Sequence, residues 1–217
     1  MAERRPLVTV AFAQSLDGSL ALEPGRPLAL SGPESAAYTH RLRACHDAIL
    51  VGIGTVLADN PRLTVRLAEG AHPQPIVVDS RLRFPAGAAL LAHPTHRVWI
   101  ATTAAAPEER LKALGDAGAA LLALPTDPAG RVSLPHLLDE LGARGIRRLM
   151  VEGGAAVITA FLSGGLADRL SVTIAPRLVG GVRALQAALN TPLRDPGWRM
   201  SGRDAILEAR LSEREDP

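Results

Sequence analysis

Short apolar runs recur along this chain, and glycine, proline or polar residues bound each of them. In the run Ile49-Leu50-Val51, apolar residues follow one another without the alternation that marks a strand with one solvated face. Such an uninterrupted run is typical of a strand that is covered on both faces. This pattern predicts buried strands at residues 7–14, 48–51, 75–78, 97–102, 119–123, 147–151 and 169–175.

Segments with helical features separate most of these strands. Ser31 and Glu34 have the spacing of a capping box and Pro33 suits a first helical turn, so we expect a helix that ends near Ala44. Further helices are expected at residues 107–117, 134–144 and 155–162, whereas residues 15–30 have the composition of a long loop. Strands joined through helices need crossover connections. The chain therefore predicts a three-layer α/β fold with a mainly parallel central sheet and helices on both faces.

The part of the chain after Gly180 is less regular, although residues 205–211 alternate like an edge strand. The sequence shows no internal repeat, no interdomain linker and no low-complexity block. At 217 residues and 47% hydrophobic content, the chain can bury a substantial core without disulfides. We therefore expect residues 1–217 to form a single domain.

The first candidate motif begins where the strand at residues 48–51 ends. Gly52 and Gly54 follow it, and residues without a side chain let a bulky ligand approach the backbone. Thr55, Asp59 and Arg66 then offer a hydroxyl, a carboxylate and a guanidinium. The alternative is that the glycines merely reverse the chain, as they do in many α/β proteins, and that Asp59, which precedes Asn-Pro, only caps or turns it.

The second candidate motif follows the strand that ends at Val151. Glu152 is succeeded by Gly153 and Gly154 and then by a predicted helix. Free N–H groups and the positive dipole end at a helix start attract phosphate groups. The motif is neither a Walker loop nor a G-x-G-x-x-G fingerprint. Because open α/β sheets bind ligands at the carboxyl ends of their strands, Glu152 is a candidate site residue; the alternative is a tight connection with Glu152 in solvent.

Both motifs, together with Ser15-Leu16-Asp17-Gly18 and Ile76-Val77-Val78-Asp79-Ser80, resemble the reductase domain of riboflavin biosynthesis. The resemblance covers about residues 6–182 in one order. That family has a dihydrofolate-reductase-like fold and uses NADPH to reduce the ribosylamino group of a pyrimidinone 5′-phosphate. The resemblance therefore implies this fold, this activity, NADP as the cofactor and a homodimer that pairs through the sheet edge.

The resemblance also implies roles for individual residues. The residues expected to bind NADP are Thr55, Asp59, Ser80, Gly153, Gly154, Ala155 and Ala156. The residues expected to bind the substrate are Ser15, Asp17, Arg43, Leu63, Arg66 and Glu152. Asp59 and Glu152 are the catalytic candidates. Ser80 with the arginines that follow it favours the 2′-phosphate of NADP, while Asp17-Gly18 is almost as well explained as a plain turn.

Three positions depart from the family pattern. Family members carry lysines where this chain has Ala11 and Ser19, and an aromatic residue where it has Ala29. Two alternatives therefore stay open: the reduction of another heterocycle such as a dihydropterin, and a nucleotide-binding regulator without catalysis. The chain also lacks the H-x-E and C-x-x-C motifs of the zinc deaminase that is fused to many bacterial relatives.

Composition limits the kinds of partner, location and metal site that we expect for this chain. A net charge of +2 and 3% aromatic residues do not indicate a nucleic-acid surface, and no run approaches the length of a membrane span. Cys45 is the only cysteine and is expected to be a small buried thiol, so we expect a reducing, cytoplasmic location. The histidine pairs at 40 and 46 and at 93 and 96 lack a third ligand, so no metal site is expected.

Overall fold

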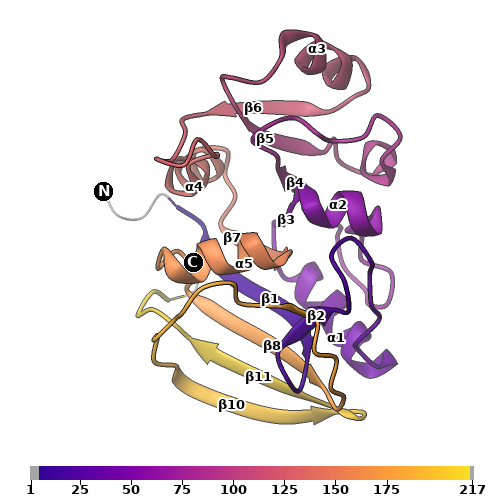
Figure 1. Ribbon diagram of the computed structural model, residues 1–217, viewed down its shortest axis with the longest axis vertical. Coiled ribbons are helices and arrows are strands. Elements are labelled where there is room, and N and C mark those ends of the chain that lie inside the picture. Colours follow the sequence, from indigo (N-terminus) through magenta and orange to yellow (C-terminus); the bar gives the residue numbers. More distant parts are fainter. Residues whose placement is uncertain (1–4, 216–217) are drawn as a thin grey trace.

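The computed structural model describes residues 5–215. In this part of the chain the central element is a nine-stranded sheet with the order β10-β11-β8-β1-β7-β3-β4-β5-β6 (Figure 1). Its strands are β1 (Leu7–Ser15), β3 (Ala48–Gly52), β4 (Gln74–Val78), β5 (Trp99–Thr103), β6 (Ala120–Leu124), β7 (Arg148–Gly153), β8 (Arg169–Ala175), β10 (Arg194–Ser201) and β11 (Asp204–Arg210). All the strands that the apolar runs predicted are present.

The sheet is mainly parallel, as predicted. β1 pairs in parallel with β7 and β8, and β3 pairs in parallel with β7 and β4. Only β11 and β10 run antiparallel to their neighbours in the described sheet. The prediction of an edge strand at residues 205–211 was wrong, because β11 lies between β8 and β10. The edge strand is β10, whose residues are almost all exposed and include Pro196 and Gly197, so it shows no apolar pattern.

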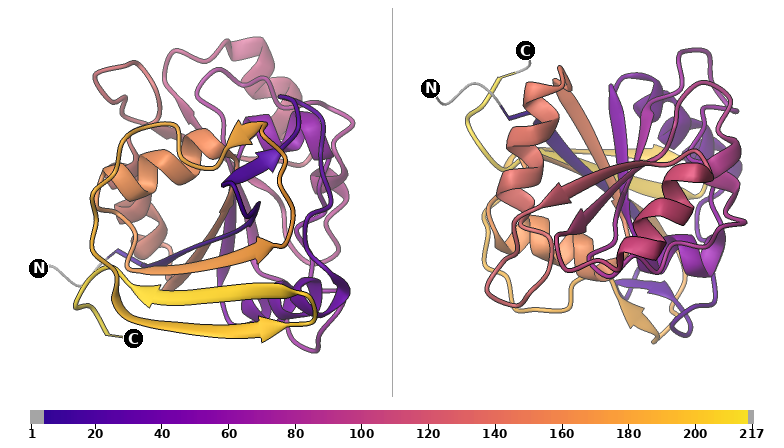
Figure 2. Two further views of the ribbon diagram at one scale, coloured as in Figure 1. Left: turned by 60° about the horizontal axis from the view of Figure 1, so that its bottom comes forward. Right: turned by 90° about the horizontal axis from the view of Figure 1, so that it is seen from above.

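Helices cover both faces of the sheet (Figure 2). On one face, Leu137 of α4 (Leu134–Ala143) and Ile158 of α5 (Ala155–Ser163) pack against Leu50. On the other face, Val56 of α2 (Ile53–Asp59) and Leu114 of α3 (Glu108–Asp116) belong to the core cluster around Ile49. The same face carries α1 (Pro33–Ala44) and the short 3-10 helix η1 (Ala89–Ala92). The three layers of the prediction are confirmed.

The start of α1 differs from the predicted capping box. Gly32 is the N-cap and no side chain caps the helix, whereas Pro33 does occupy the first turn. The Gly32 N–H group instead donates to Oδ2 of Asp204, 2.7 Å away on β11. A buried carboxylate from a distant strand thus binds the N–H group of the N-cap residue, and local spacing carries no signal of this contact.

Two further details correct the sequence predictions. The loop at residues 15–30 contains β2 (Ser19–Ala21), which pairs with β9 (Val182–Arg183) in a small separate sheet. Cys45 is exposed rather than buried, because it follows the last turn of α1 as the C-cap and lies outside the core. Across residues 5–215, no helix combines the length and apolar character that crossing a membrane requires.

Candidate active site

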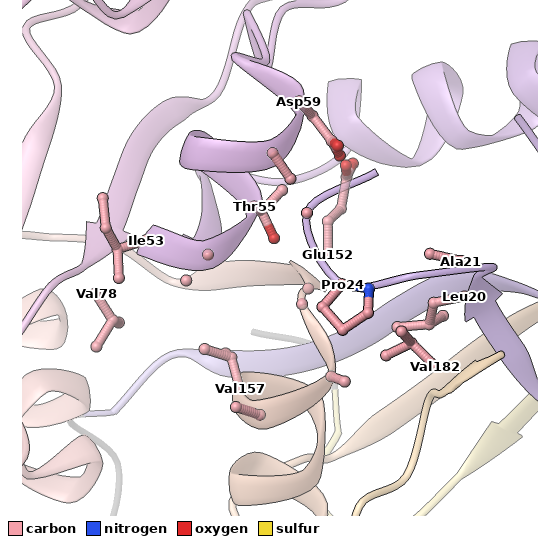
Figure 3. A pocket seen from close by; sticks show the side chains of 18 of the residues that line it. Leu20, Ala21, Pro24, Ile53, Thr55, Asp59, Val78, Glu152, Val157 and Val182 are labelled. Atoms are coloured by element: carbon pink, nitrogen blue, oxygen red, sulfur yellow. The ribbon is translucent and has the colours of Figure 1, made fainter. Parts of the chain in front are cut away.

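A cleft of about 750 Å³ opens at the carboxyl ends of the central parallel strands (Figure 3). Ala13 of β1, Gly52 of β3, Val78 of β4 and Glu152 of β7 all line it. Both glycine motifs therefore meet in one cleft, at the edge where open α/β sheets bind their ligands. The loop that contains Pro24 covers one side, and Val182 of β9 also contributes to the wall.

The glycines let the two motifs approach each other closely. A Cβ atom at Gly52 would lie 2.7 Å from Cγ2 of Val157 on α5, a contact that real side chains do not tolerate. A Cβ atom at Gly154 would lie 3.2 Å from Oγ1 of Thr55 on α2. The end of β3 therefore lies directly against the start of α5, and the Thr55 hydroxyl lies beside the glycine pair.

The start of α5 faces the cleft through Gly154, Ala155 and Ala156. Gly154 is the N-cap of this nine-residue helix, and no side chain accepts a hydrogen bond from its first N–H groups. The first N–H groups of a helix have no partners within the helix and point along its positive dipole end. This start is therefore suited to an anionic group in the cleft.

All the residues predicted to bind the cofactor line the cleft: Thr55, Asp59, Ser80, Gly153, Gly154, Ala155 and Ala156. Burial raises the pKa of Asp59 above its usual value. In Figure 3 the carboxylates of Asp59 and Glu152 lie at the same end of the cleft. The two catalytic candidates are therefore brought together, although they come from different motifs.

The hydroxyl of Ser80, which follows β4, accepts a hydrogen bond of 2.9 Å from the Val132 N–H group. Arg81 and Arg83 line the cleft there, as predicted for the region after Ser80. Sequence reasoning missed Arg131, which joins them from the turn after β6 and forms an ion pair of 2.9 Å with Asp127. No motif marks Arg131, since only the folding of that turn onto Ser80 places it at the cleft.

Glu152 and Arg43 form a bidentate ion pair. Nε of Arg43 lies 2.6 Å from Oε1 of Glu152, and Nη2 lies 2.7 Å from Oε2. Nη1 of Arg43 donates to the carbonyl oxygen of Thr64 at 3.0 Å. Burial opposes the charge of Arg43, but the Glu152 carboxylate outweighs burial, so the pKa of Arg43 is raised. Two of the predicted substrate residues are therefore in direct contact.

Arg66 lies next to this ion pair. Its Nη1 group donates to Oγ1 of Thr64 at 2.7 Å, and its side chain is otherwise exposed. Burial, followed by the charges of Arg43 and Arg62, lowers the pKa of Arg66. The side chain of Leu63 is buried and its φ is +54°, so the chain turns sharply just before Arg66. The predicted residues Arg43, Leu63 and Arg66 thus form one basic corner beside Glu152; of these four residues only Glu152 lines the cleft itself.

Ser15 and Asp17 lie elsewhere and do not line the cleft. The Ser15 hydroxyl donates to Oδ1 of Asp17 at 2.6 Å, and the Asp17 carboxylate accepts the N–H groups of Val179 and Gly180 at 2.9 and 2.8 Å. The Ser15 hydrogen bond, followed by those from the two N–H groups, lowers the pKa of Asp17. These contacts fix the turn after β1 to the chain near β9, and the predicted substrate contact of both residues stays a prediction.

The basic corner and the glycine motifs can be compared with known proteins. Residues 6–207 match the family described as the RibD C-terminal domain. The chain belongs to this family. Its relatives include proteins from Archaeoglobus fulgidus and Methanothermobacter thermautotrophicus, both named 2,5-diamino-6-ribosylamino-4(3H)-pyrimidinone 5′-phosphate reductase. The first is 41% identical over 187 residues, which is 82% of this chain and 83% of the relative. The second is 42% identical over 180 residues, which is 82% of this chain and 81% of the relative.

Solved structures agree with this assignment. RibD from Acinetobacter baumannii superposes with a TM-score of 0.83 and 25% identity, covering 98% of this chain and 59% of its own length. The riboflavin biosynthesis reductase Rib7 from Saccharomyces cerevisiae has a TM-score of 0.78 and 30% identity, covering 98% of this chain and 92% of its own. The predicted resemblance and the dihydrofolate-reductase-like α/β fold are confirmed.

Proposed function

We propose that residues 1–217 act as one cytoplasmic reductase domain of riboflavin biosynthesis. The reaction is the NADPH-dependent reduction of a ribosylamino-pyrimidinone 5′-phosphate, the substrate class in the names of the two archaeal relatives. The observation that carries the proposal is the meeting of both glycine motifs and the pair Asp59 and Glu152 in one cleft.

The cofactor half of the cleft fits a dinucleotide. The glycines leave space at the start of α5 that a Cβ atom at Gly154 would partly occupy. The first N–H groups of α5 have no side-chain partner and are suited to bind a diphosphate. When bound, the nicotinamide supplies the hydride. Thr55 and the segment from Gly153 to Ala156 hold the cofactor at its diphosphate. Ser80, Arg81 and Arg83 line the cleft, and we assign to them the 2′-phosphate that distinguishes NADPH from NADH.

The substrate half is the basic corner. Arg66 carries most of the contact with the substrate phosphate, and Arg43 adds charge while it holds Glu152. The chain at Leu63 sets the position of Arg66, and Ser15 and Asp17 hold the turn that borders the site. Reduction adds a hydride and a proton to the substrate. We assign the proton to Asp59, because burial raises its pKa and it lies at the same end as Glu152.

The three positions that depart from the family pattern, Ala11, Ser19 and Ala29, do not line the cleft themselves, although their neighbours Phe12, Leu20 and Leu28 do. Ser19 is buried, and its hydroxyl donates to Oδ2 of Asp17 at 2.9 Å. The dihydropterin alternative that these positions leave open is therefore part of the reduction assay.

We further propose a homodimer that pairs through β10. This strand is one of the two edges of the large sheet, the other being β6, and two large apolar side chains on β10 are exposed, Trp198 to 62% and Met200 to 68%. An unpaired edge with exposed apolar residues is a surface that a second chain can cover.

The direct test is a reduction assay. The protein is mixed with NADPH and either the phosphorylated pyrimidinone or a dihydropterin, and loss of reduced cofactor is followed by absorbance. We expect turnover with the pyrimidinone only, and a weaker affinity for NADH than for NADPH. Turnover of the pterin alone would establish the other reductase activity. Tight NADPH binding without turnover of either compound would favour the regulator.

A further inference from the structure

His40 lies behind the basic corner and has no role in the proposed reaction. It is on α1 and is only 5% exposed. Its Nδ1 atom accepts a hydrogen bond of 2.9 Å from the backbone N–H group of Arg66. An N–H group donates this bond, so Nδ1 carries no proton and the imidazole is the neutral tautomer with its proton on Nε2.

Burial and the neighbouring positive charges keep the His40 imidazole neutral. Burial, then the charges of Arg43 and Arg66, lower its pKa to about 4, whereas Glu152 acts in the opposite direction. A neutral imidazole with a free Nδ1 lone pair is the form that accepts a backbone N–H bond. The acceptor therefore persists across the pH range in which enzymes are assayed.

Two side chains of α1 hold neighbouring points of the same segment. His40 and Arg43 are three residues apart, so they lie on one side of the helix. Arg43 donates to the Thr64 carbonyl oxygen at 3.0 Å, and His40 accepts the Arg66 N–H group at 2.9 Å. The backbone is thus fixed to α1 on each side of Val65. The Arg66 guanidinium contacts the Thr64 hydroxyl and remains available to the substrate.

We propose that His40 is the positioning residue for Arg66, and that its Nδ1 hydrogen bond sets the affinity for the phosphate group of the substrate. This inference rests on the proposed function, since it takes Arg66 as the phosphate ligand. His40 touches neither substrate nor cofactor. His40 affects substrate binding only through the position of the Arg66 guanidinium.

Two substitutions separate the hydrogen bond from the bulk of the ring. In His40→Asn the amide oxygen takes the position of Nδ1 and keeps the acceptor, whereas in His40→Gln the amide extends toward the position of Nε2 and the acceptor at Nδ1 is lost. We expect His40→Gln to raise KM for the phosphorylated substrate about tenfold, because a buried N–H group loses its partner and Arg66 moves. We expect kcat and NADPH affinity near the original values, and His40→Asn close to the unchanged protein.

His46 supplies the matched control. It is the other histidine near the end of α1, and it contacts the Leu42 carbonyl oxygen at 2.7 Å and Oγ1 of Thr9 at 2.9 Å, away from Arg66. His46→Gln should therefore leave the KM for the phosphorylated substrate unchanged. In an Arg66→Ala background, His40→Gln should add no further loss, since the two residues act through one contact.

A binding measurement separates this inference from the proposed reaction. Ribose 5-phosphate and ribose are titrated calorimetrically into the protein without cofactor, which reports the phosphate site even if no reduction occurs. We expect His40→Gln to weaken ribose 5-phosphate about tenfold and to leave ribose unchanged. Equal losses for both sugars, an equal loss in His46→Gln, or failure of His40→Asn to restore affinity would overturn the role of His40. A protein that binds ribose 5-phosphate normally but reduces no pyrimidinone would instead contradict the proposed function.

Discussion

Arg43 and Glu152 lie 109 positions apart in the chain and share two hydrogen bonds of 2.6 and 2.7 Å. The contact joins the last turn of α1 to the carboxyl end of β7, and both side chains are mostly buried, with exposed fractions of 12% and 14%. Removal of one partner of such a pair leaves the other charge in a place where water solvates it poorly. The ion pair therefore links the stability of the fold to the geometry of the substrate half.

Glu152→Gln should destabilise the protein by about 2 kcal/mol, because Arg43 keeps its charge and loses its counter-ion in a mostly buried position. The free energy of unfolding is measured by urea titration. The control is Glu140→Gln, which breaks a more exposed ion pair with Arg144 and should change stability by less than about 1 kcal/mol. Equal effects in both variants would show that burial of the Arg43 pair contributes nothing.

Gly154→Val should weaken NADPH binding at least about tenfold, since the new side chain begins 3.2 Å from Oγ1 of Thr55 and extends into the diphosphate cradle. Fluorescence titration with NADPH measures the affinity, and a melting curve confirms the fold. Gly115→Ala on α3 is the control, because a Cβ atom there meets no other group within 4 Å. Normal cofactor affinity in a folded Gly154→Val protein would rule out the start of α5 as the phosphate site.

Arg66→Ala should raise KM for the phosphorylated substrate far more than for its dephosphorylated analogue, with NADPH affinity unchanged. A charge-assisted contact to phosphate contributes on the order of 2 kcal/mol, or roughly thirtyfold in KM. Arg66→Lys should recover part of the loss, since a point charge does not reproduce the two-pronged contact. Steady-state kinetics measure KM for both substrates. An equal increase in KM for the two would mean that Arg66 has a structural role or contacts the cofactor.

Two histidines should make the protein less stable in mild acid. The pKa values of His40 and His93 are lowered to about 4, chiefly by burial and then by neighbouring cations or histidines, from an ordinary value of 6.5. Between these values the unfolded chain binds more protons than the folded protein, so stability is complete above pH 6.5 and is lost as pH falls toward 4. The expected loss at about pH 5 is on the order of 1 kcal/mol for each histidine after allowance for solvent screening.

Urea titrations at about pH 7 and about pH 5 measure this dependence. His93→Asn should flatten it in part, because it removes one of the histidines whose pKa is lowered, the others being His40 and His46, whose pKa burial also lowers. His136→Asn is the control, since His136 lies at the start of α4 and pairs with the Ser133 hydroxyl. A dependence that is unchanged in His93→Asn would mean that His93 does not titrate with unfolding.

Trp198→Glu should convert the proposed dimer into a monomer. The substitution places a charge on the exposed face of β10, where a partner strand would bury the indole. Light scattering at micromolar concentration measures the mass of each protein. Leu178→Glu is the control, because Leu178 is also exposed, at 75%, but lies in the loop after β8. A monomer in the unchanged protein would refute the dimer.

Sequence patterns predicted the central strands, in which consecutive residues are buried on both faces of the sheet. The run Ile49-Leu50-Val51 is fully enclosed between two helical layers, so its pattern and its environment agree. The glycines of the two motifs were predicted to admit a ligand, which stays a prediction. The contacts that a Cβ would make at Gly52 and Gly154 are with Val157 and Thr55, so the close packing of the two motifs is a further reason for these two glycines. The motif residues were placed in the cleft because they follow strand ends, which a parallel sheet brings together.

The remaining features depend on contacts between distant residues. The helix α2 has seven residues with a glycine in its first turn, and it is held by the packing of Ile53 and Val56 rather than by helix propensity. Asp204 of β11 accepts the Gly32 N–H group just before α1, and Arg131 reaches the cleft only because its turn folds onto Ser80. None of these contacts leaves a periodic signal in the chain.

The position of β1 between β7 and β8 determines when the central sheet can assemble during synthesis on the ribosome. Leu7 pairs with Arg148 and Thr9 pairs with Arg169, so the first strand made has both of its neighbours near the end of the chain. Long separations of this kind slow folding, because a large loop closes before any contact forms. A nascent chain that ends before residue 148 therefore leaves both edges of an apolar strand unpaired, and β1 has its two neighbours only after β7 and β8 have been made.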